Sequence, residues 1–145
     1  MIYEIKNAGK FGKGAFALRD IKKGESIATF AGEELNRVEI HNRIISEQEN
    51  IDDPLQIDDD CFIDIDGSTY YFNHSCEPNS GIRGRCELIT IKDINKGDEI
   101  TFDYAATVGV NIENWTMNCS CGEKNCRKII GNVLTVPKDK IDEYY

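Results

Sequence analysis

The chain has 145 residues, 40% of them hydrophobic and 30% charged, so we expect one globular domain with a modest core. Its 26 acidic residues outnumber 17 basic ones, and the formal net charge of −9 argues against sequence-independent nucleic-acid binding. The charge favours a basic partner such as a lysine-rich peptide, although an acidic surface that serves only solubility would give the same value. No apolar run approaches a membrane span and no signal-peptide pattern is present, so we expect a cytoplasmic or nuclear protein without membrane contact.

Turn residues divide the N-terminal part into short predicted strands. Residues 1–6 are expected to form a strand, followed by a glycine-containing loop at 7–14 and extended chain at 15–19. The segments 22–25 and 95–98 each place lysine before glycine and then an acidic residue, a pattern typical of hairpin turns. They precede predicted strands at 26–30 and 99–102.

The middle and C-terminal parts contain the predicted helices. Residues 35–48 carry a rough helical stripe of Val38, Ile40, Ile44 and Ile45, and the helix is expected to end before Asp52-Asp53-Pro54. Further expectations are two strands within 55–65 around Asp58–Asp60, a strand at 87–91, a strand within 128–136 and a short helix at 138–145. No internal repeat or linker is visible, so the pattern predicts a single, mostly β domain of α+β class.

Three of the six cysteines, Cys119, Cys121 and Cys126, fall within eight residues of a turn-rich segment. Zinc binds thiolates in tetrahedral geometry, so a structural site requires a fourth soft ligand. Cys61, Cys76 and Cys86 are the candidates, and Cys76 fits best because Pro78 and polar neighbours place it in a loop. Cys61 and Cys86 stand in apolar surroundings and are expected to be buried. The alternative to a metal site is a loop with three free thiols.

Other motifs are less specific on their own. The loop at Gly12–Gly14 lacks the features of a dinucleotide or phosphate loop and suits a plain turn. The acidic run at Asp58–Asp60 fails the calcium-loop spacing and is expected to be solvated. His74 is interpreted as a hydrogen-bonded polar histidine. The aromatic residues are interpreted either as core or as the walls of a narrow channel for a long aliphatic amine: Tyr70, Tyr71, Phe72, Phe102 and Tyr104.

Taken together, four motifs in order resemble the SET-domain protein-lysine methyltransferases over nearly the whole chain. They are Gly12-Lys13-Gly14, Asn73-His74-Ser75-Cys76-Glu77-Pro78-Asn79, Gly97-Asp98-Glu99-Ile100-Thr101-Phe102-Asp103-Tyr104 and the 119–126 cysteine cluster continuing into Arg127. The last resembles the family's post-SET zinc motif. Tyr70-Tyr71 stand where the family often has Arg-Phe, and no cysteine-rich region precedes the first motif.

The resemblance implies a SET fold of small β-sheets with a threaded, knot-like C-terminal segment, with a SET domain at 1–116 and a post-SET zinc segment and tail at 117–145. It implies S-adenosylmethionine as methyl donor and zinc held by Cys76, Cys119, Cys121 and Cys126. The acceptor is a lysine in a protein or peptide, with histone tails among the family's substrates. Tyr104 is the implied catalytic residue. The implied cofactor-binding residues are Lys13, Gly14, Ala15, Asn73, His74 and Tyr104.

The resemblance also implies a substrate channel lined by Tyr71 and Phe102. In the family the position of Phe102 influences how many methyl groups fit, and phenylalanine there favours di- or trimethylation. The alternative function is a non-catalytic SET-fold module that binds a basic peptide. The presence of Tyr104 with Asn73 and His74 favours the enzyme.

Overall fold

A computed structural model describes residues 2–46, 54–109, 112 and 115–144. The parts of the predicted elements that fall on Met1, 47–53 and Tyr145 lie outside these described residues. Among the described residues, no helix combines the length and apolar composition needed to cross a membrane. The described chain is mostly β, with one α-helix and four short 3₁₀ helices. This content confirms the predicted fold class.

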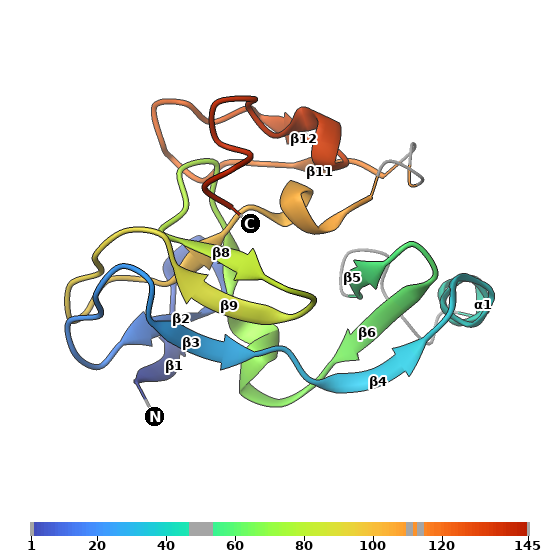
Figure 1. The fold of residues 1–145 in the computed structure, drawn as a ribbon, viewed down its shortest axis with the longest axis horizontal. Helices are drawn as coiled ribbons and strands as arrows, with labels where there is room; N and C mark the ends of the chain where they lie inside the picture. Colours follow the sequence, from blue (N-terminus) through green and yellow to red (C-terminus); the bar gives the residue numbers. More distant parts are fainter. Residues whose placement is uncertain (1, 47–53, 110–111, 113–114, 145) are drawn as a thin grey trace.

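Eight of the described strands form three small antiparallel sheets, ordered β1-β2, β3-β9-β8 and β4-β6-β5 (Figure 1). Their bounds are β1 Tyr3–Asn7, β2 Lys13–Ala17, β3 Ser26–Thr29, β4 Gly32–Leu35, β5 Leu55–Asp58, β6 Cys61–Ile65, β8 Ser80–Arg83 and β9 Glu87–Thr90. The hairpins β1-β2, β5-β6 and β8-β9 pair strands that are neighbours in sequence, whereas the β3-β9 and β4-β6 pairings join strands far apart in the chain.

Two further strand pairs join distant parts of the chain. β7 (Asn73–His74) runs parallel to β10 (Thr101–Phe102), and β11 (Met117–Asn118) is antiparallel to β12 (Ile129–Ile130). In Figure 1 the orange and red C-terminal segment with β11 and β12 lies across the top of the view, beyond β8 and β9. The 3₁₀ helices are η1 Gly9–Phe11, η2 Gly67–Tyr71, η3 Tyr104–Thr107 and η4 Val133–Thr135.

Helix α1 (Arg37–Ile45) is shorter at its start than the predicted helix because Asn36 caps it. The Asn36 side chain accepts a hydrogen bond from the Glu39 amide, and the Glu39 carboxylate accepts one from the Asn36 amide, which is a capping box. Of the predicted apolar stripe only Ile40 is buried, while Val38 and Ile45 are exposed. The helix therefore packs through Ile40 near Phe62 of β6, the central strand of its sheet, and leaves much of its surface open.

The main core lies between the small sheets and contains a chain of aromatic contacts. The ring of Phe30 packs against Phe72 and Phe102, with centroids 5.9 and 5.5 Å apart, and Phe102 packs against Tyr104 at 4.9 Å. A second buried cluster surrounds the C-terminal segment and includes Cys76, Trp115 and Cys119. The aromatic chain links the main core to Tyr104, the residue to which the sequence resemblance assigns catalysis.

Several local expectations hold and several fail. The strands within 55–65 and 87–91 are confirmed. The turns at 22–25 and 95–98 form, but neither closes a hairpin: Ile21 and Ile94, which precede them, pair with each other through two 2.8 Å hydrogen bonds. The strands on either side of each turn belong to different sheets. Cys61 and Cys86 are only half-buried.

The C-terminal expectation of a helix at 138–145 is wrong over the described part. Residues 138–143 form turns, and the carbonyl of Tyr144 accepts a hydrogen bond from the Ile82 amide at 2.8 Å. Gly81 allows this approach, because a Cβ there would lie 2.7 Å from the Tyr144 oxygen. Pairing with β8 thus takes the place of helical hydrogen bonds. The strand expected within 128–136 is limited to β12, and β4, β7, β8 and β11 are not predicted from the sequence.

Candidate active site

The parallel pair β7-β10 brings the two central motifs side by side. Asn79 strengthens this pairing from the end of the first motif: its side-chain amide donates to the Glu99 carbonyl at 2.8 Å and accepts from the Thr101 amide at 3.0 Å. The Ser75 amide donates to the Phe102 carbonyl at 3.2 Å. Sequence reasoning gave Asn79 no role of its own, yet it fixes the register that sets Asn73 and His74 beside the segment leading to Tyr104.

Tyr104 is the first residue of η3 and is held at both its hydroxyl and its backbone. The hydroxyl donates to the Phe72 carbonyl at 2.7 Å. The backbone amide donates to Nδ1 of His74 at 3.0 Å, and the two rings lie 5.4 Å apart. Tyr104, Phe102 and His74 therefore form a fixed cluster in which the direction of the phenol is set by the Phe72 carbonyl, between η2 and β7.

The contacts of His74 define its protonation state and tautomer. Burial, as the main cause, together with the nearby Arg127 charge lowers the pKa of His74 to about 4, against an opposing effect of Asp103. Nδ1 accepts the Tyr104 amide proton, so the neutral ring carries its own proton on Nε2. Nε2 lies 3.4 Å from Sγ of Cys76. The neutral state makes the 3.6 Å approach of Nδ1 to Asp103 a contact rather than an ion pair. His74 is a polar linker, in agreement with the sequence interpretation.

The glycine loop lies against the start of the central motif. The side-chain amide of Asn73 donates both to the Lys13 carbonyl at 2.9 Å and to the Glu99 carboxylate at 2.8 Å. A Cβ at Gly14 would overlap the Glu99 carboxylate and crowd the Asn73 amide, so any other residue here would displace the Glu99 side chain. The result is a polar junction of three segments that could hold a ligand with both cationic and polar groups. Glu99 was not singled out from the sequence, although it stands inside the third motif.

A cavity of about 1090 Å³ opens beside this junction. Of the residues assigned from the sequence, Lys13, Tyr71, Asn73, Phe102 and Tyr104 line it, together with the largely buried Trp115. His74 and Cys121 line a smaller polar hollow of about 290 Å³ that shares Asn73 with the first. Gly14 and Ala15 are buried in β2 and do not line either hollow. The larger cavity has the size and mixed lining of a small-molecule site.

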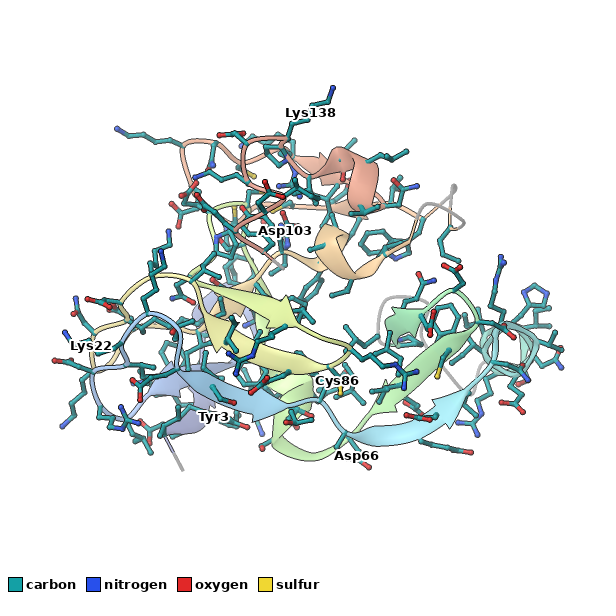
Figure 2. All side chains as sticks on the ribbon, in the orientation of Figure 1. Tyr3, Lys22, Asp66, Cys86, Asp103 and Lys138 are labelled. Atoms are coloured by element: carbon teal, nitrogen blue, oxygen red, sulfur yellow. The ribbon has the colours of Figure 1, made fainter. Side chains whose placement is uncertain are left out.

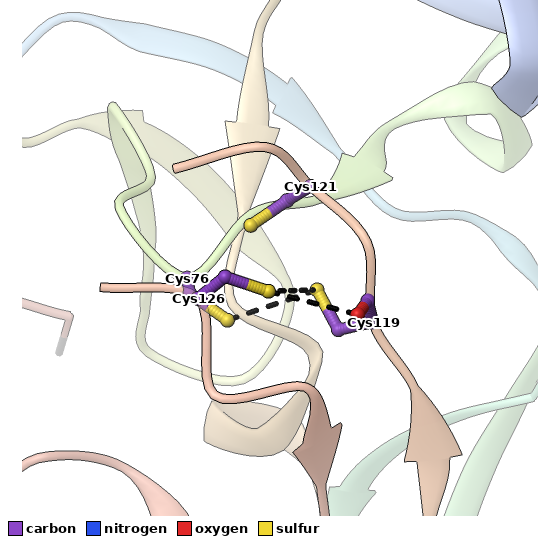
Figure 3. Close-up of side chains that lie close together, drawn as sticks. All are labelled: Cys76, Cys119, Cys121 and Cys126. Carbon is purple, nitrogen blue, oxygen red and sulfur yellow. Dashed lines mark hydrogen bonds between the residues drawn. The ribbon is translucent and has the colours of Figure 1, made fainter. Parts of the chain in front are cut away.

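The four predicted metal ligands converge. Sγ atoms of Cys76, Cys119, Cys121 and Cys126 all lie within 4.8 Å of one another (Figure 3). The Cys76–Cys119 and Cys119–Cys126 sulfur distances are both 3.7 Å. Tetrahedral zinc with Zn–S bonds of about 2.3 Å requires sulfurs about 3.8 Å apart, so the donor set and its spacing fit zinc. Cys61 and Cys86, the other candidates for the fourth ligand, are outside the cluster.

Backbone amides support the cluster. The Lys128 amide donates to Cys126 and lowers the pKa of that thiol to about 7, while burial raises the pKa of the Cys76 and Cys119 thiols. The Arg127 amide donates to Sγ of Cys76 at 3.4 Å. A bound cation would reverse the effect of burial, because metal ligation needs thiolates and releases their protons. The two backbone amides then donate hydrogen bonds to negatively charged thiolate sulfurs.

One ion pair at the site was not predicted. Both terminal nitrogens of the Arg127 guanidinium donate to the Asp103 carboxylate, at 2.8 and 2.9 Å. Asp103 also accepts a hydrogen bond from the Ala105 amide and so caps η3. Figure 2 labels Asp103 between the C-terminal segment and the sheets. A sequence signal existed, since an arginine directly after a predicted ligand and an aspartate directly before Tyr104 are both charged residues beside site residues.

Known proteins resemble this chain in sequence. The sequence model of the SET domain family matches residues 12–105. The variant-silencing SET domain-containing protein of Plasmodium falciparum (isolate 3D7) is 36% identical over 140 residues, covering 85% of this chain and 5% of that protein. The histone-lysine N-methyltransferase, H3 lysine-36 specific, of Candida albicans (strain SC5314 / ATCC MYA-2876) is 32% identical over 136 residues, covering 83% of this chain and 15% of that protein.

A solved structure extends the comparison to the fold. The methyltransferase domain of human histone-lysine N-methyltransferase SETMAR superposes with a TM-score of 0.72 at 24% identity, covering 90% of this chain and 58% of that chain. This likeness establishes the fold. The chain spans 5% and 15% of the length of the two curated relatives named above.

Proposed function

The chain belongs to the SET-domain family, and from this premise we propose that it is a protein-lysine N-methyltransferase that uses S-adenosylmethionine. The single observation that carries the proposal is the setting of Tyr104. Its hydroxyl is held by the Phe72 carbonyl, its amide by His74, and its ring lines the cavity beside Phe102. Tyr104 is thus held by two hydrogen bonds with its ring at the cavity, an arrangement suited to orienting a group of a bound ligand.

We assign cofactor binding to Lys13, Gly14, Ala15, Asn73, His74 and Tyr104. S-adenosylmethionine, when bound, supplies a methyl group activated by its sulfonium charge. The junction of Asn73, Lys13 and Glu99 offers an amide, a carbonyl and a carboxylate to a cationic ligand, which fits this donor. Gly14 and Ala15 contribute the close backbone approach rather than side-chain contacts. The smaller hollow beside His74 adds polar volume next to the same junction.

The lysine side chain is proposed to enter along Tyr71 and Phe102. The Tyr104 hydroxyl uses its hydrogen in the bond to the Phe72 carbonyl. Its oxygen can therefore accept a hydrogen bond and orient an N–H of the incoming amine. The aromatic walls keep water away from the amine, and Phe102 is only 4% exposed. Orientation of the amine along the line of displacement is the main contribution expected from these residues.

We further propose that the product is di- or trimethyl-lysine. Phe102 packs on Tyr104 with centroids 4.9 Å apart and brings no hydroxyl to the channel. A water at that place would need polar partners, and an apolar ring removes one of them. The space beside the amine then accommodates a methylated nitrogen.

Zinc is proposed as the ion of the four-cysteine cluster, with residues 117–145 as the post-SET segment that follows a SET domain at 1–116. Zinc closed by four thiolates is a structural ion without an open position. The proposed acceptor is a lysine in a protein, with histone tails as the first class to examine because a matched relative is named for H3 lysine-36. The net charge of −9 supports a basic partner, and a histone substrate would imply nuclear location.

The test is transfer of labelled methyl groups. The purified chain is incubated with labelled S-adenosylmethionine and core histones or cell-extract proteins, and modified lysines are identified by mass spectrometry. Incorporation that depends on Tyr104 supports the proposal. Cofactor binding without any transfer would instead identify a non-catalytic module that binds basic peptides.

A further inference from the structure

The cysteine cluster and Tyr104 are joined by two short chains of contacts. In the first, Sγ of Cys76 lies 3.4 Å from Nε2 of His74, whose Nδ1 accepts the Tyr104 amide proton. In the second, Arg127 directly follows the ligand Cys126 and grips Asp103, which directly precedes Tyr104. Both routes lead from the four-cysteine cluster to η3, and only the second begins in the C-terminal segment, through the side chain of Arg127.

The Arg127–Asp103 ion pair is largely buried and has a fixed geometry, unlike a solvent-exposed surface ion pair. The Asp103 side chain is fully buried and the Arg127 side chain is 15% exposed. The bond is bidentate, which fixes the relative orientation of the two planar groups as well as their distance. Arg127 Nε is buried and has no hydrogen-bond partner among the described residues. The side-chain hydrogen bonds of Arg127 therefore come from its two terminal nitrogens, and both go to the Asp103 carboxylate.

The same carboxylate sets the start of η3. Oδ1 of Asp103 accepts hydrogen bonds from the Arg127 guanidinium and from the Ala105 amide, the second at 3.0 Å. Tyr104 lies between Asp103 and Ala105 in the sequence. A shift of the Arg127 guanidinium therefore reorients the Asp103 carboxylate that caps η3. The backbone of Tyr104, which carries the phenol, then moves with the start of this helix. Because misplacement of a reacting group by about 1 Å can lower a rate by about 10²-fold, this geometry bears directly on turnover.

We propose that Arg127 is a positioning residue for Tyr104, and that it makes the position of the Tyr104 hydroxyl depend on the folded cysteine cluster. The inference rests on the proposed methyl transfer. It gives the C-terminal segment, residues 117–145, a role beyond stability. The cysteine cluster fixes the backbone on both sides of Arg127, and the guanidinium in turn fixes the Asp103 carboxylate directly before Tyr104.

The variants separate positioning from stability. Arg127→Met alone leaves the Asp103 carboxylate buried without its partner, which destabilises the fold. The double variant Arg127→Met with Asp103→Asn removes both charges and keeps an oxygen that can cap the Ala105 amide. Arg127→Lys keeps the positive charge but loses the bidentate contact with the Asp103 carboxylate. None of them alters the Arg127 backbone amide that donates to Cys76.

Arg83→Met is the matched control. Arg83 makes the same kind of two-point contact with Glu87, at 2.8 and 2.9 Å, but on the exposed surface of the β8-β9 hairpin. It removes one arginine from an ion pair without touching η3. The measurements for every variant are zinc content, melting temperature, hydrogen exchange of the amides at 104–107, cofactor affinity, and kcat and KM for a validated substrate.

We expect the double variant to keep its zinc and its cofactor affinity while amide exchange at 104–107 speeds at least 10-fold and kcat falls about 10- to 100-fold. Arg127→Lys should lie between it and wild type, and Arg83→Met should match wild type. Addition of a chelator to wild type should speed exchange at the same amides.

Wild-type exchange and kcat in the double variant would overturn the inference. Loss of zinc in that variant would also overturn it, because Arg127 would then serve the cluster and not Tyr104. If wild type transfers no methyl group to any substrate, the proposed function fails, but the exchange measurement still decides whether Arg127 holds the Tyr104 backbone.

Discussion

Replacing Tyr104 with phenylalanine removes one hydroxyl and tests its proposed role. In the folded protein that hydroxyl makes a 2.7 Å hydrogen bond to the Phe72 carbonyl, and the ring packs on Phe102 and His74. Phenylalanine keeps the ring contacts, so the loss of unfolding free energy is that of one neutral hydrogen bond, about 1 kcal/mol. For a chain of this size this lowers the melting temperature by about 3–4 °C.

The effect on turnover should be larger than the effect on stability. Removal of one positioned group at a reaction centre typically lowers kcat by about 10²- to 10³-fold, equal to about 2.7–4 kcal/mol of transition-state stabilisation. We expect at least this loss, measured as labelled methyl transfer at saturating cofactor. Zinc content and cofactor affinity should change little, because neither depends on the hydroxyl alone.

Tyr3→Phe is the matched control. Tyr3 is 5% exposed, its hydroxyl pairs with the Ser68 hydroxyl at 2.9 Å, and its ring also packs on Phe72. The substitution removes an equivalent bond away from the cavity, so it should cost similar stability and leave turnover near wild type. Equal turnover losses in the two variants would refute the assignment of Tyr104, as would undiminished transfer by Tyr104→Phe.

Three further predictions concern the metal, the product and the cofactor loop. Cys76→Ser should reduce bound zinc from about one ion per chain to a small fraction, whereas Cys61→Ser should not; full occupancy in the first, by metal analysis, would exclude Cys76 as a ligand. Phe102→Tyr should shift products towards monomethyl-lysine in a mass-spectrometric time course with little loss of first-step rate, and a wild-type reaction that stops at one methyl group with enzyme in excess would contradict this. Gly14→Ala should weaken cofactor binding by calorimetry because its Cβ would displace the Glu99 carboxylate, and an unchanged affinity would show that this junction does not contact the cofactor.

Local chemistry explains which parts of the fold are visible in the sequence. The strand at 87–90 is rich in β-branched residues, and the 119–126 cysteines have ligand spacing that few other functions require. The start of α1 is also encoded locally, since Asn36 and Glu39 have capping-box spacing, but the predicted helix begins at residue 35, one residue before the cap. Gly32–Leu35 has no β-branched residue and becomes β4 only by pairing with β6.

The site shows the same division. Its residue types could be assigned from motifs, but their mutual geometry could not. β7 and β10 contain two residues each, too few for any periodic signal, and their parallel pairing depends on Asn79 reaching across to Thr101. The pairing of Asp103 with Arg127 likewise depends on how the C-terminal segment returns to η3. Such long-range contacts leave no local pattern.

The two-residue pairing of β7 with β10 has a consequence for the order of folding. The three hairpins close loops of a few residues, whereas the Asn73–Glu99 contact spans 26 residues and the Cys76–Cys119 contact spans 43. Closing longer loops costs more entropy before any contact offsets it, so non-local pairs form late. We therefore expect the hairpins to form before the surroundings of Tyr104, and the contacts within the four-cysteine cluster to form late.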